Sequence, residues 1–215
     1  MKKTILILSL LALSFSCKQK ERKVISEPQL TVAEKIANAH GFQNWDKVSE
    51  IQFRFGKKRL WNWNPKTNDV KLTTDTDTIA YNTKSVDTTS YKADQAFIND
   101  KFWLLIPFQL VWDTSASISE PIEATAPVAK TTMHKITITY SNEGGYTPGD
   151  AYDIFYNDDY IIKEWIFRRG NSPEPNLINT FENLQDFNGI KIATDHTREN
   201  GKPIVKLSEI KVTLE

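Results

Sequence analysis

The chain of 215 residues is poor in the side chains that build redox and metal sites, because it holds one cysteine and three histidines. A single cysteine excludes an internal disulfide, and the sequence contains no C-x-x-C pair. The histidines, His40, His134 and His196, lie far apart in the chain. We therefore expect no metal site and no cofactor, and we expect the burial of apolar side chains to stabilise the fold.

The sequence also lacks the motifs of the common catalytic classes. It has no phosphate-binding loop, no G-x-S-x-G, no H-E-x-x-H and no Rossmann glycine pattern. Asp195 precedes His196, but adjacent residues of a strand face opposite sides, which argues against a catalytic dyad. His134 shares a predicted strand face with Ile136 and Ile138, as a packed histidine does. We expect no enzymatic activity; the alternative is a hydrolase that uses a histidine–carboxylate pair at His134 or His196.

Positive charge is scarce once the first thirty residues are set aside. The chain has 27 basic and 27 acidic residues, but residues 1–30 contain six of the basic and two of the acidic ones. The remainder is mildly acidic, so we expect no binding of nucleic acid. Asp150, Asp153, Asp158 and Asp159 lack the regular spacing of a calcium loop, and we interpret them as solvated loop and turn residues.

No apolar run is long enough to span a membrane, which takes about 20 residues. Residues 4–16 are almost wholly apolar, follow Lys2 and Lys3, and end at Ser16. A basic start, a short apolar stretch and a small final residue are typical of a secretory signal. We therefore predict a signal peptide over residues 1–16.

The only cysteine, Cys17, directly follows this segment, which resembles a bacterial lipobox. The resemblance implies cleavage before Cys17 and acylation of its thiol, for example with palmitate. Ser14 stands where a typical lipobox has leucine, and Leu13 lies one place earlier; the alternative is a plain signal peptide with a chance cysteine. Residues 17–30 are polar and basic, and we predict a lipidated, flexible leash.

Aromatic residues are abundant, with six tryptophans and eleven phenylalanines. Tryptophan side chains can line an apolar cavity that holds an acyl chain or another hydrophobic ligand, or they can fill a solid core. The tryptophans that we predict to line such a cavity are Trp61, Trp63, Trp103, Trp112 and Trp165.

Residue patterns predict a mixed order of elements. Thr31 and Glu34 form a capping box that opens a helix, and Gly41 is a natural stop. Alternating apolar residues predict three or four strands between residues 48 and 82. A second helix is expected to begin after Thr89 or Ser90 and to end at about Ile106, before Pro107.

Residue patterns in the rest of the chain predict a long loop over residues 113–131 and strands after it. About five strands follow, with turns at Asn157-Asp158 and Asn200-Gly201. We expect the apolar segment from Phe97 to Trp112 to pack against the sheet, with Asn99, Asp100 and Lys101 on its exposed side; contact with a membrane surface is the alternative.

Short connections imply an antiparallel sheet, and a sheet of many twisted strands curls. We predict an α+β fold in which residues 31–215 form a single half-barrel domain of about eight or nine strands, with a helix in its concave face. This element order, and the closing segment DFNGIKIATDHTRENGKPIVKLSEIKV, resemble the half-barrels of LolA, LolB and related periplasmic lipoproteins.

These observations predict a noncatalytic lipoprotein anchored to the membrane by its acyl group. We expect it in the outer membrane, facing the periplasm. Its partner would be a hydrophobic ligand, such as a lipid or a lipoprotein acyl group, or another envelope protein.

Overall fold

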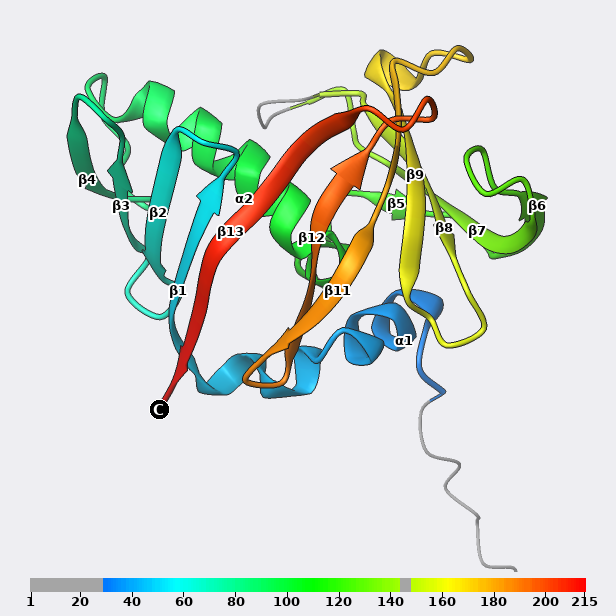
Figure 1. The fold of residues 1–215 in the computed structure, drawn as a ribbon, viewed down its shortest axis with the longest axis horizontal. Coiled ribbons are helices and arrows are strands. Elements are labelled where there is room, and N and C mark those ends of the chain that lie inside the picture. Colours follow the sequence, from blue (N-terminus) through cyan, green and yellow to red (C-terminus); the bar gives the residue numbers. More distant parts are fainter. Residues whose placement is uncertain (1–28, 144–147) are drawn as a thin grey trace, which may run out of the picture.

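Thirteen β-strands and two α-helices account for most of residues 29–143 and 148–215, the ranges that this computed structural model describes. The predicted signal peptide, Cys17 and the leash up to residue 28 lie outside these ranges. Every strand pairing among the described residues is antiparallel, so the α+β class with a helix against antiparallel sheet is confirmed (Figure 1).

The strands form a seven-stranded sheet and a six-stranded sheet. In spatial order the first contains β11 (Glu182–Phe187), β12 (Ile190–Thr197), β13 (Pro203–Leu214), β1 (Val48–Phe55), β2 (Arg59–Asn64), β3 (Asp69–Thr73) and β4 (Thr78–Asn82). The second contains β10 (Leu177–Thr180), β9 (Ile162–Arg168), β8 (Ala151–Tyr156), β7 (Thr132–Thr139) and β5 (Ser117–Ile118), and β6 (Ile122–Thr125) also pairs with β7. The predicted half-barrel of about eight or nine strands is not confirmed, because the described strands are more numerous and form two sheets.

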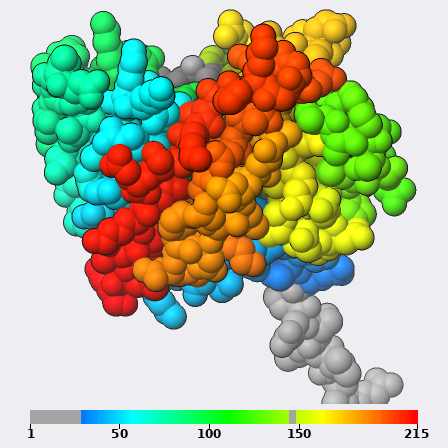
Figure 2. All heavy atoms as spheres, viewed as in Figure 1, coloured from blue at the N-terminus to red at the C-terminus, as the bar shows by residue number. Residues whose placement is uncertain are grey.

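The two sheets meet where the chain bends at Phe181. Before the bend, β10 pairs with β9, and after it β11 pairs with β12. Among the described residues, one isolated bridge, between Asn179 and Arg198, joins the two sheets at this corner, and the segments on either side of it adjoin on the surface of the molecule (Figure 2). Strands that change sheets through a bend make the corners of curved and orthogonal packings.

The first helix, α1 (Val32–Ala39), begins and ends as the sequence predicts. Thr31 and Glu34 form both hydrogen bonds of a capping box. Gly41 follows with φ of 96°, and a Cβ atom there would lie 1.8 Å from the carbonyl oxygen of Gly189. Only glycine allows this close approach between the end of α1 and the β11–β12 turn. A 3₁₀ helix, η1 (Phe42–Lys47), leads into β1.

The second helix, α2 (Tyr91–Trp112), is longer than predicted because it continues through Pro107. Leu105 leaves the helical region, with φ of −131° and ψ of 34°, two residues before the proline. The kink places Pro107 in the first turn of a new helical segment, where its missing N–H has no partner to lose. The predicted end at Ile106 was therefore wrong.

Both sheets pack against α2. Phe97, Leu104 and Phe108 belong to the core of the seven-stranded sheet, whereas Ile106 and Leu110 belong to the core of the six-stranded sheet. Each fully buried side chain of this size contributes about 1.5–3 kcal/mol to folding. This packing confirms the prediction that the apolar segment from Phe97 to Trp112 packs against sheet.

The expected exposed side of α2 was wrong in part. Asn99 is exposed and Lys101 is half-buried, but the Asp100 side chain is completely buried. Its carboxylate accepts two hydrogen bonds from the guanidinium of Arg59, at 2.6 and 2.8 Å, and one from the indole N–H of Trp61 at 2.8 Å. The charge is tolerated inside because β2 supplies these donors.

Candidate functional site

A cavity of about 900 Å³ lies between α2 and the six-stranded sheet. This volume falls in the range of about 300–1,000 Å³ that is typical of small-molecule sites. Six aromatic side chains form most of its apolar wall, and we call it the aromatic cavity; they are Phe102, Trp103, Tyr140, Tyr152, Trp165 and Phe167.

Strand register explains the aromatic wall on the sheet side. Tyr152 of β8 stands opposite Phe167 of β9, and Phe167 stands opposite Leu177 of β10. Side chains at paired positions share one face of a sheet, so these three residues form a row across three strands. The ring centroids of Tyr152 and Phe167 are 5.0 Å apart, and those of Tyr152 and Trp165 are 5.2 Å apart.

The helix closes the other side of the cavity with residues at helical spacing. Four lining residues follow one another at intervals of four or seven positions, which return to the same face of a helix; they are Ile98, Phe102, Gln109 and Asp113. The ring of Phe102 reaches the sheet, where its centroid lies 4.7 Å from that of Tyr152. The helix and the sheet therefore share one continuous set of aromatic contacts.

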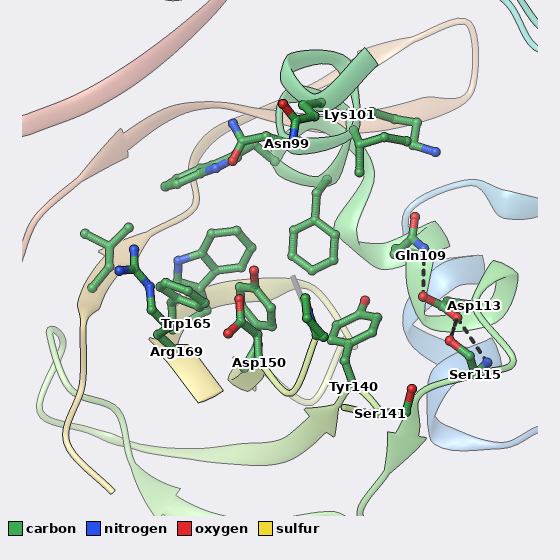
Figure 3. Close-up of a pocket in the computed structure, with 18 of the residues that line it drawn as sticks. Asn99, Lys101, Gln109, Asp113, Ser115, Tyr140, Ser141, Asp150, Trp165 and Arg169 are labelled. Carbon is green, nitrogen blue, oxygen red and sulfur yellow. Dashed lines mark hydrogen bonds between the residues drawn. The ribbon is translucent and has the colours of Figure 1, made fainter. Parts of the chain in front are cut away.

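Two carboxylates border the aromatic rings. Asp150 is 5% exposed and accepts a hydrogen bond from the backbone N–H of Gly170 at 2.8 Å. Asp113, just after α2, accepts from the backbone and the hydroxyl of Ser115 at 3.0 and 2.6 Å. Figure 3 shows Asp150 between Trp165 and Tyr140, with Asp113 and Ser115 on the far side of Tyr140.

Both tyrosines of the cavity are held in their neutral form. Burial, with a smaller contribution from the charge of Asp113, raises the pKa of Tyr140 above its ordinary value. Burial and the charge of Asp150 raise the pKa of Tyr152 in the same way. The phenol groups can therefore act as hydrogen-bond donors at neutral pH, and each lies in the field of a carboxylate.

The structure does not bring the five predicted tryptophans together. Trp103 and Trp165 line the aromatic cavity, with ring centroids 4.7 Å apart. Trp61, Trp63 and Trp112 lie instead in or against the core of the seven-stranded sheet. The tryptophans fall into two groups because α2 presents different faces to the two sheets. The positions of the tryptophans in the sequence do not reveal this division.

Four of the six aromatic lining residues were not predicted from the sequence: Phe102, Tyr140, Tyr152 and Phe167. The alternation in residues 134–140 did place Tyr140 on the same strand face as Ile136 and Ile138. Tyr152 was hidden because β8 is buried at every position, which removes the period of two that separates one face from the other. Phe167 was hidden because the burial of β9 does not alternate regularly either.

The buried histidines do not form catalytic pairs. His196 Nδ1 lies 3.0 Å from the carbonyl oxygen of Thr180, and its ring packs against Trp103 and Phe181. Asp195 instead contacts Lys206 and Asn183. The side chains of Asp195 and His196 therefore face opposite sides of the strand, as strand geometry predicts.

A histidine–carboxylate pair does exist at the surface. His134 Nε2 lies 2.8 Å from Asp158 Oδ1, but the Asp158 side chain is 98% exposed, and neither residue lines the aromatic cavity. Asp153 pairs with Arg168 rather than with the other aspartates. Across residues 29–143 and 148–215, no group of three or more His, Cys, Asp or Glu side chains could hold a metal ion.

The comparisons with known proteins give no family for this chain: no protein-family model, no curated protein and no solved structure matches it. Within the described residues, no helix is both long enough and apolar enough to cross a membrane.

Proposed function

We propose that this protein is a noncatalytic lipoprotein of the cell envelope that binds a hydrophobic ligand in the aromatic cavity. The ligand would be a lipid or the acyl group of a lipoprotein. The observation that carries this proposal is the cavity itself, because a space of about 900 Å³ walled by six aromatic rings offers apolar burial to a ligand.

We further propose that the two sheets act together as one curved, half-barrel-like support for α2. The bend at Phe181 and the bridge between Asn179 and Arg198 support this reading, because they connect the sheets at their common corner. This support would be the counterpart of the LolA- and LolB-like half-barrel that we predict from the order of the elements. The alternative function is to present a surface to another envelope protein. Tests of ligand binding distinguish this alternative from the binding of a hydrophobic ligand.

The membrane anchor is proposed from the sequence around Cys17. Cys17→Ala is expected to prevent acylation and to release the protein from the membrane fraction, because each buried acyl CH₂ contributes about 0.8 kcal/mol to membrane binding. The measurement is the distribution of the full chain between salt-washed membranes and supernatant, with Ser16→Ala as the control that keeps the thiol. Retention of the Cys17→Ala protein in the washed membranes would contradict the anchor.

We propose the outer membrane, facing the periplasm, as the location. Added protease should then leave the protein intact in whole cells and digest it after the outer membrane is permeabilised. Digestion in whole cells would place the domain on the outer surface instead.

Ligand binding is tested with Ile98→Lys, which puts a charge into the helix wall of the aromatic cavity. The probe is N-phenyl-1-naphthylamine, a neutral apolar fluorophore, added to the full chain that carries Cys17→Ala. We expect its affinity to fall at least about tenfold, because an apolar ligand would have to share the cavity with an ammonium group.

The matched control is Ile122→Lys, which adds the same charge on β6 at a residue that is 54% exposed. It should leave binding of the probe unchanged. Equal affinities for all three proteins, or no binding to any of them, would argue against a ligand-binding cavity and would favour the protein-partner function. Native mass spectrometry of the purified full chain provides a second readout, since a bound lipid adds its mass.

A further inference from the structure

Two carboxylates of the aromatic cavity, those of Asp150 and Asp113, form no ion pair among the described residues. Asp150 is almost completely buried, yet no lysine, arginine or histidine lies within ion-pair distance of it among the described residues. Asp113 also forms no ion pair within the described ranges, and its carboxylate accepts hydrogen bonds from Ser115 and Gln109. A buried charge without a counter-ion is costly, so a cation that enters the cavity would relieve that cost.

The rings between the two carboxylates add to this field. An aromatic ring is negative over its face, and cations bind within about 6 Å of the ring centroid. Phe102, Tyr152 and Trp165 are in mutual contact, with centroids 4.7, 5.2 and 5.7 Å apart. Tyr140 extends the set, 6.3 Å from Tyr152. One positively charged group in the cavity would therefore lie close to several of these rings.

Two cations also belong to the wall, and neither forms an ion pair with Asp150 or Asp113, although Lys101 lies in the electrostatic field of Asp113. The Lys101 ammonium lies 5.7 to 5.9 Å over the rings of Trp63, Phe97 and Trp112, which belong to the other core. Arg169 is exposed at the rim, and among the described residues it forms no ion pair with Asp113 or Asp150. Figure 3 places Lys101 beside Asn99, away from Asp150.

We propose that the ligand of the aromatic cavity is an amphiphile that carries a positively charged ammonium group. Its apolar part would lie against the aromatic wall, and its ammonium group would lie near Asp150 and Asp113, over the rings of Tyr140 and Tyr152. This inference rests on the proposed ligand-binding function and specifies the chemistry of the ligand head group.

The test compares three probes with the same eight-carbon apolar chain: octyltrimethylammonium, octanol and nonanoate. Each is titrated, below its aggregation concentration, into the full chain that carries Cys17→Ala, and binding is followed by calorimetry. We expect the cation to bind at least about tenfold more tightly than the alcohol, and the carboxylate to bind most weakly.

Variants assign the preference to the carboxylates. Asp150→Asn and Asp113→Asn should each reduce the advantage of the cation severalfold and leave binding of the alcohol unchanged. The matched control is Asp75→Asn, which removes one charge from an exposed loop outside the cavity and should change neither. Circular dichroism checks that each variant is folded. If Asp150→Asn does not fold, the proposal is still tested by the three probes with the unchanged cavity and by the Asp113→Asn variant.

The outcomes separate the two proposals. If none of the three probes binds, the ligand-binding function itself fails. If the alcohol or the carboxylate binds as tightly as the cation, or if the asparagine variants keep the full preference, ligand binding stands and the cationic head group is wrong.

Discussion

Lowering the pH from 7 to 4 is expected to destabilise the folded protein by about 6 kcal/mol through two buried histidines. Burial is the main cause that lowers the pKa of His40 and of His196 from the ordinary 6.5 to about 4. Each shift is equivalent to about 3 kcal/mol. Typical domains have a stability of only about 5–15 kcal/mol, so this loss is a large fraction of the total.

The sign follows from which state takes up the proton first. In the unfolded chain both rings are protonated as the pH falls through 6.5, whereas the folded protein keeps them neutral down to about pH 4. The contribution of the two histidines to stability is therefore complete above pH 6.5 and is lost as the pH falls from 6.5 to 4. Below pH 4 their contribution changes no further. In each ring Nδ1 faces a backbone carbonyl, of Ile36 or Thr180, so this nitrogen carries the proton of the neutral form.

The measurement is urea unfolding at pH 7 and at pH 4 for the unchanged chain and for His196→Asn. Asparagine keeps a donor near the position of Nδ1 and does not titrate, so the pH-dependent loss should shrink by about 3 kcal/mol. His134→Asn, which removes a histidine from the surface, is the matched control and should retain most of the loss. Equal pH dependence in His196→Asn and the unchanged chain would show that His196 is not the responsible group.

Asp100→Leu is expected to cost about 3–5 kcal/mol of stability. The Asp100 side chain is fully buried and that of Arg59 is 33% exposed. Without Asp100, Arg59 would lose its counter-charge, and the fully buried indole N–H of Trp61 would lose its acceptor. The surface pair Arg54–Glu209 provides the control, because Glu209 is about half exposed and Glu209→Ala should cost much less stability than Asp100→Leu.

A double variant distinguishes a broken ion pair from a general packing defect. Asp100→Leu with Arg59→Met removes both charges, and it should recover much of the stability lost in Asp100→Leu alone. Urea unfolding of the four combinations gives the coupling free energy directly. The geometry indicates that Asp100 and Arg59 are coupled. If Arg59→Met costs as much stability in the Asp100→Leu background as in the unchanged chain, the two residues are not coupled.

The location and kind of many elements could be read from the sequence because their signals are local. The capping box of Thr31 and Glu34, the helix stop at Gly41 and the turn at Asn200-Gly201 each depend on the conformational preferences of a few adjacent residues. The antiparallel pairing followed in the same way from short connections. Strands without a clear period of two, such as β10 and β11, were missed for lack of such a signal.

The cavity and the buried charges were decided only by tertiary structure. The sequence shows that Asp100 is charged, but only the arrival of Arg59 and Trp61 from β2 makes a buried position tolerable for it. Likewise, the sequence shows that tryptophans are abundant, but the kink at Leu105 and the two-sided packing of α2 determine which of them meet. Burial and ion pairing depend on distances between residues far apart in the chain, and local preferences do not encode those distances.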